Sequence, residues 1–274
     1  MFKQTMIALT SAATIGAVFT SSAGAASLIG ISFNGDVFSI NSETGTGTFL
    51  GNSGFISNGA ASDSSGTIYT VDRGGILGTL VQIDPLTGVG TAVTPVRTPN
   101  FSVRGLAFDE NDILYAVLSQ TSTATDDVLA TIDTNTGLVS QIGTISNLTS
   151  IQSLAFSPDG RLFARDAIRA LYELNPLTGD ASLVGRTSPN NIQALEFKPD
   201  GSLLGIRNQL FEIDPSTGVT NLVGGGGYAD IRGLAFISSV PKDAPEDVPE
   251  PVSVLSLLIV GAVAAGDALK KKTT

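Results

Sequence analysis

The residue types on which most enzymes rely are absent from this chain. Its 274 residues include no cysteine, no histidine and no tryptophan, which excludes thiolate nucleophiles, imidazole bases and the usual zinc ligands. One carboxylate stands out of pattern, because Glu196 occupies a position that is alanine in four matching segments, at Ala61, Ala107, Ala155 and Ala235. A carboxylate among alanines on a buried strand is expected to pair with a cation or to have a shifted pKa. Glu196 is therefore the candidate acid–base residue.

The acidic residues that recur most regularly have a structural explanation. Asp84, Asn175 and Asp214 each begin an Asp/Asn-Pro-x-Thr-Gly segment. In such turns the side chain accepts backbone N–H bonds two residues further on, and the glycine adopts a left-handed conformation. Calcium binding is the alternative, but it requires about six to eight converging oxygens. We predict turns here and no metal site.

The elements that carry these residues form a repeat. Five Thr-Gly pairs recur at a spacing of about 40 residues, which is typical of propeller blades and of helical repeats; they begin at Thr44, Thr87, Thr136, Thr178 and Thr217. The 31 glycines, 12 prolines and many β-branched residues exclude the helical alternative. Each copy also contains an alternating pair such as GLAF and LYAV around a Pro-Asp-Gly type turn, so one repeat is a four-stranded meander.

The two ends of the repeat region are incomplete in complementary ways. The first strand, residues 28–32, is of the LYAV type, and the last, residues 231–236, is of the GLAF type without a following partner. Pairing of these strands would complete one blade and remove both open edges. We therefore predict an all-β fold, a five-bladed β-propeller of four-stranded blades over residues 27–238. The alternative is an open solenoid of the same units.

Loops on the face opposite the regular turns vary in length, and variable loops on a rigid frame are where binding usually occurs. One equivalent position before each GLAF-type strand is polar in every copy; it holds Asn58, Arg104, Gln152, Gln193 and Arg232. These side chains are predicted to surround the channel mouth, where the two arginines could receive a carboxylate, a sulfate or a sugar. The alternative is that they pair with Asp72, Asp166 or Asp230 and only fill the channel.

The chain termini carry export signals. Residues 1–26 have Lys3, an apolar stretch and small residues before Ala26, which indicates a secretory signal peptide. After a linker at 239–248, the tail at 249–274 combines a Pro-Glu-Pro, an uncharged stretch and a lysine cluster, at Pro249, Glu250, Pro251, Lys270, Lys271 and Lys272. The uncharged stretch is short for a permanent anchor.

This tail resembles the PEP-CTERM sorting signal of Gram-negative bacteria that produce extracellular matrix. The resemblance implies an exosortase-type processing enzyme as partner, transient membrane association, and a final location in the periplasm, at the outer surface or in the extracellular matrix. The lysines stand where arginines are commoner, and Asp267 is a further departure. A simple tail anchor is the alternative.

The repeat itself resembles secreted bacterial propellers of the YVTN and NHL type through LAFxPDGxLYA and IDPxTGxxxxIG. That resemblance implies a fold and leaves the activity open. The net charge of −10 disfavours nucleic acid as a partner, and no cofactor is expected. We predict a noncatalytic exported protein that binds a polysaccharide or a surface protein. The alternative is a propeller hydrolase or lactonase that uses Glu196 together with acids of the face that carries the variable loops, in one version around a divalent cation.

Overall fold

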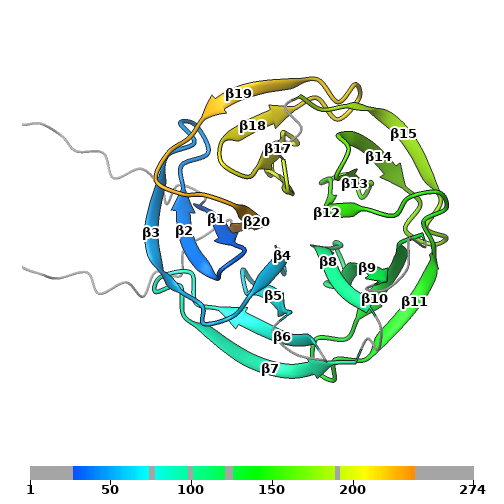
Figure 1. Ribbon diagram of the computed structural model, residues 1–274, viewed down its shortest axis with the longest axis horizontal. Helices are drawn as coiled ribbons and strands as arrows, with labels where there is room; N and C mark the ends of the chain where they lie inside the picture. Colours follow the sequence, from blue (N-terminus) through cyan, green and yellow to red (C-terminus); the bar gives the residue numbers. More distant parts are fainter. Residues whose placement is uncertain (1–26, 74–77, 98–100, 121–125, 189–191, 238–274) are drawn as a thin grey trace, which may run out of the picture. The chain divides into compact units, whose positions relative to one another are not determined.

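The computed structural model describes residues 27–73, 78–97, 101–120, 126–188 and 192–237, and these residues form five four-stranded antiparallel sheets arranged as a ring (Figure 1). The prediction of a five-bladed β-propeller is confirmed. Four blades are continuous in sequence. The second blade contains β4 (Ser57–Ser62), β5 (Ile68–Asp72), β6 (Gly78–Ile83) and β7 (Gly90–Val96), and the third contains β8 (Phe101–Phe108), β9 (Leu114–Gln120), β10 (Val128–Ile132) and β11 (Val139–Thr144). The fourth contains β12 (Ile151–Phe156), β13 (Leu162–Asp166), β14 (Ala170–Leu174) and β15 (Ala181–Arg186), and the fifth contains β16 (Ala194–Phe197), β17 (Leu203–Ile206), β18 (Leu210–Ile213) and β19 (Thr220–Gly224).

The remaining blade, here called the closing blade, combines both ends of the repeat region. Its order is β20 (Ile231–Ile237), β1 (Ser27–Ser32), β2 (Asp36–Ile40) and β3 (Gly47–Asn52), so the last strand lies innermost beside the first (Figure 1). In this antiparallel pair Leu28 faces Phe236 and Ile29 faces Ala235. The ring is thus closed by hydrogen bonds between its two ends, as predicted, and an open solenoid is excluded.

The inner strands β20, β4, β8, β12 and β16 surround the axis of the ring (Figure 1), and because every blade has the same order of strands, they all run from one face of the ring to the other in the same direction. We call the face where they begin the N face and the face where they end the C face. The connections between blades lie on the N face, whereas the Thr-Gly turns and the turns that follow the inner strands lie on the C face. In these Thr-Gly turns Asp84 accepts the Leu86 N–H at 2.8 Å, and Asp214 accepts the Ser216 N–H at 2.8 Å, as predicted.

The hydrophobic core lies between neighbouring blades. Between the closing and second blades, for example, Ile29 and Ala235 pack with Ala60, Ile68 and Val81. Along each strand, successive side chains point to opposite faces of the blade, so apolar residues contact the preceding blade and the following blade in turn. The blades are therefore stabilised mainly by burial against each other.

A second contact between blades recurs near the outer rim. A glycine at the last or penultimate position of an outermost strand lies directly against the carbonyl oxygen of the Thr-Gly turn of the following blade. The pairs are Gly51 with Thr87, Gly143 with Thr178, Gly185 with Thr217, and Gly224 with Thr44 across the closure. A Cβ at any of these glycines would collide with that carbonyl. The repeated Thr-Gly pair and the glycine near the end of the outermost strand thus form one contact between neighbouring blades.

Candidate functional site

Three arginines gather on the N face. Arg104 lies in β8, Arg232 in β20, and Arg73 directly follows β5. Burial lowers the pKa of the Arg73 guanidinium, and the positive charges of Arg104 and Arg232 lower it further. The sequence prediction included Arg104 and Arg232 but missed Arg73, because it lies in a connecting loop and not at the repeated register position.

Arg232 is held in place by neighbouring groups. Its Nε lies 3.1 Å from Asp230 Oδ1, which also lies 2.8 Å from Arg207 Nε. The Arg232 guanidinium lies 4.9 Å from the centre of the Phe33 ring, a cation–π distance. Burial acts to raise the pKa of Asp230, but hydrogen bonds from Arg232 and Arg207 outweigh it and leave the pKa below its ordinary value. The predicted alternative, pairing with Asp230, therefore applies to Arg232.

Arg104 differs from Arg232 in having no such partners. Its Nε is buried without a hydrogen-bond partner among the described residues, and Arg104 forms no ion pair with any of them. Its charge acts on buried Asp127, whose carboxylate accepts the Ile151 N–H at 2.7 Å. Burial raises the pKa of Asp127, and the Ile151 N–H, the Ser119 hydroxyl and the Arg104 charge oppose this shift. Arg104 thus retains unused donor capacity.

The three amides of the predicted set are less available. Asn58 and Gln152 are buried, and the Gln152 amide donates to the Ser150 carbonyl at 3.1 Å. Gln193 precedes β16, and its Oε1 is buried without a partner among the described residues. Asp166, the other predicted partner of the ring, instead accepts N–H bonds within its own turn, from Ile168 and Ala170. The arginines are therefore the part of this set best suited to contact a ligand.

Sequence reasoning also missed a buried cation. Arg165 is fully buried in β13 and donates to Thr187 Oγ1 at 2.9 Å, to the Asp166 carbonyl at 3.1 Å and to the Ile192 carbonyl. Burial lowers its pKa to about 10, so it stays charged at neutral pH. It connects the fourth blade to the chain entering the fifth.

The C face has a cavity of about 530 Å³ at the channel mouth. Its wall includes Glu196 and four phenylalanines that lie at the last or penultimate position of an inner strand; these are Phe108, Phe156, Phe197 and Phe236. Burial raises the pKa of the Glu196 carboxyl to about 8, opposed by the N–H of Phe197, which it accepts at 3.1 Å. No described cation forms an ion pair with Glu196. Of the two predicted outcomes, the shifted pKa applies.

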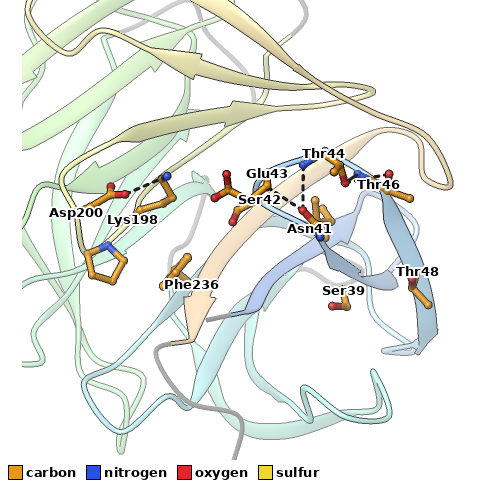
Figure 2. Close-up of a pocket in the computed structure, with 12 residues that line it drawn as sticks. Ser39, Asn41, Ser42, Glu43, Thr44, Thr46, Thr48, Lys198, Asp200 and Phe236 are labelled. Carbon is orange, nitrogen blue, oxygen red and sulfur yellow. Dashed lines mark hydrogen bonds and ion pairs between the residues drawn. The ribbon is translucent and has the colours of Figure 1, made fainter. Parts of the chain in front are cut away.

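A groove of about 740 Å³ adjoins this cavity at the seam between the fifth and closing blades (Figure 2). In Figure 2 the ion pair of Lys198 and Asp200 lies on one side, the turn from Asn41 to Thr46 on the other, and Phe236 between them. The groove has a topological cause. In the other four blades a turn joins the inner strand to the next, but β20 and β1 are separate ends of the repeat region. No turn among the described residues covers this space.

Among the described residues, no group of three or more Asp or Glu side chains is close enough to hold a metal ion. Nor do these residues include a helix of sufficient length and apolar character to span a bilayer. The signal peptide at 1–26 and the sorting residues Pro249, Glu250, Pro251 and Lys270 to Lys272 lie outside the described residues.

Comparison with known proteins supports the fold. No family model and no curated protein matches the chain. Among solved structures, it is similar to a symmetrical protein studied for its de novo evolutionary emergence, with 18% identity, a TM-score of 0.54, and coverage of 76% of this chain and 97% of that one. It is also similar to a gluconolactonase from Xanthomonas campestris, with 13% identity, a TM-score of 0.52 and 73% of each chain covered. At these identities the likeness indicates a common β-propeller fold and no particular activity.

Proposed function

We propose that this protein is a noncatalytic, exported binding propeller that holds an anionic group of a surface polysaccharide or surface protein on its N face. The observation that supports this best is the convergence of Arg73, Arg104 and Arg232 in a chain of net charge −10. Clustered like charges repel each other, and an anion bound between them would relieve that repulsion. Guanidinium groups also bind carboxylates and sulfates through paired hydrogen bonds.

The distribution of charge on the ring favours this proposal. Among the described residues, only Arg161 and Lys198 are cations in turns of the C face, and each lies within 3.1 Å of an aspartate. The remaining described cations are arginines at or near the N face. An approaching polyanion would therefore be steered toward the N face and repelled by the acidic turns of the C face.

The test is titration of the purified chain with hexagalacturonate and with a sulfated hexasaccharide. We expect saturable binding that weakens with salt, and a loss of about tenfold or more in affinity for Arg104→Gln/Arg232→Gln, since charge-assisted hydrogen bonds contribute about 1.5–3 kcal/mol each. Arg186→Gln, which removes one exposed charge from the outer strand β15, should bind within about twofold of the parent chain. Absence of saturable binding to both probes contradicts the proposal.

The alternative function, hydrolysis at Glu196, has one supporting observation, because a carboxyl with a pKa of about 8 in a cavity is suited to general acid–base catalysis. The same preparations can be assayed against lactones and glycosides. Turnover by the parent chain that disappears in Glu196→Gln would favour the hydrolase and overturn the noncatalytic proposal.

Export and processing form a separate part of the proposal, supported by the sequence of both termini. We expect an exosortase-type enzyme to cleave the tail, so that mass spectrometry of the protein recovered from outside the cytoplasm finds a C-terminus upstream of Lys270. Recovery of exported chains that still end in Lys270 to Thr274 would show that the tail is retained.

A further inference from the structure

The seam groove has features of a binding site that differ from those of the arginine cluster. The wall formed by the closing blade is rich in hydroxyl-bearing residues, and the hydroxyls of Ser39, Ser42 and Thr48 form no hydrogen bond with any described residue. Phe236 lies between the two walls and is only partly buried. Unpaired hydroxyls beside an accessible aromatic ring match the alternating polar and apolar faces of a sugar.

The charges around the groove disfavour an anionic ligand. Lys198 is the only described cation in its walls, and its Nζ is already 3.1 Å from Asp200 Oδ2. Glu43 lies on the opposite wall, and the adjoining cavity is lined by further acids, Asp63, Asp109 and Glu110. An anionic chain would meet repulsion along this path, whereas an uncharged polyhydroxylated chain would not.

The groove and the mouth cavity share Lys198, Pro199 and Phe236, so they form one path from the rim of the ring to its axis. Their volumes of about 740 and 530 Å³ each lie within the range of about 300–1,000 Å³ common for ligand sites. We propose that this path on the C face binds an uncharged oligosaccharide chain, with one sugar ring stacked on Phe236 and the chain end beside Glu196. The proposal does not depend on the anion site of the N face.

Glu196 gives this site an expected pH dependence. A protonated carboxyl can donate a hydrogen bond to a sugar oxygen, whereas a carboxylate loses hydration when a neutral ligand covers it. Since burial raises its pKa to about 8, the protonated form predominates below that pH and is lost above it. Affinity should therefore be constant at lower pH and fall above pH 8, by about fivefold for the loss of one hydrogen bond.

The experiment is calorimetric titration of the full chain with cellohexaose, mannohexaose and maltohexaose between pH 6 and pH 9.5. We expect saturable binding to at least one of them, and weaker binding above pH 8. Glu196→Gln keeps a hydrogen-bond donor at every pH, so the affinity of this variant should no longer fall above pH 8. The other titratable groups of the groove and cavity are unchanged in it; they are Lys198, Asp200, Asp63, Asp109 and Glu110. Phe236→Ala should abolish binding.

A second pair of variants separates loss of the site from loss of the fold. Ser42→Arg places a long side chain in the groove and should weaken binding at least tenfold. Thr134→Arg makes the same kind of change at the matching turn position of the third blade and should leave binding unchanged. Failure of all three hexasaccharides to bind, or equal effects of these two variants, overturns the proposal, as does binding of spermine alone. Hexagalacturonate binding that survives Ser42→Arg would show the N-face site to be independent.

Discussion

Arg165→Ala is expected to lower the free energy of unfolding by about 3–5 kcal/mol, a large share of the stability of a typical domain. The substitution removes the donors for Thr187 Oγ1 and for the carbonyls of Asp166 and Ile192, all in the buried region between the fourth and fifth blades. Each buried acceptor left without a donor costs about 1–3 kcal/mol. Equilibrium urea unfolding, followed by the signal of the tyrosines or by circular dichroism, measures the effect.

Arg186→Ala is the matched control, since Arg186 is an exposed arginine in the same blade. It should change the free energy of unfolding by no more than about 0.5 kcal/mol. Arg165→Val should lose less than Arg165→Ala, because an aliphatic side chain of this size fills the equivalent positions of the other blades, at Ile31, Val71, Val117 and Ile206. An Arg165→Ala variant as stable as Arg186→Ala would show that the buried hydrogen bonds contribute nothing.

Arg165 also illustrates what sequence reasoning can and cannot find. The blade count and the closure were predictable because each depends on local signals, such as the alternation of LYAV and the φ of the turn glycines, with Gly179 at +81°. The sequence itself contains an arginine at a position that is aliphatic in the other four repeats. The role of Arg165 was not predictable, because the acceptor at Ile192 comes from a different blade and only the packed ring brings it within reach.

The candidate sites show the same division. Glu196 was identified because the equivalent positions of the other repeats hold alanine, and such a difference can be read from the sequence alone. Arg73 was missed because loop residues have no register to compare. The seam groove was also missed, although it follows from the closure itself: β20 ends the repeat region and β1 begins it, so no turn joins this inner strand pair. Side-chain burial, which distinguishes Arg104 from Asn58, depends on packing between blades.

The second large effect is expected for Gly185→Ala, which should destabilise the ring by about 2–3 kcal/mol. Gly185 is the penultimate residue of β15, the outer strand of the fourth blade, and a Cβ added there would collide with the Thr217 carbonyl of the fifth. Its backbone is outside the left-handed region, so alanine is conformationally acceptable there and the cost arises from the collision alone. The same contact recurs at Gly51 and Gly143, so these positions should respond similarly. At Gly224 the φ of +159° adds backbone strain to the collision. Urea unfolding of the Gly185→Ala chain measures the loss.

Gly201→Ala distinguishes this contact from a general cost of replacing glycine. Gly201 has a φ of +89° and no heavy atom within 4 Å of the added Cβ, so its substitution introduces backbone strain without a collision and should cost about 1 kcal/mol. If the interblade contact governs the outer rim, Gly185→Ala must be the more damaging of the two, although Gly201 has the more restrictive backbone. The opposite order would mean that the blades separate at the rim at little cost, and that the closing strand pair and the interblade cores alone hold the ring together.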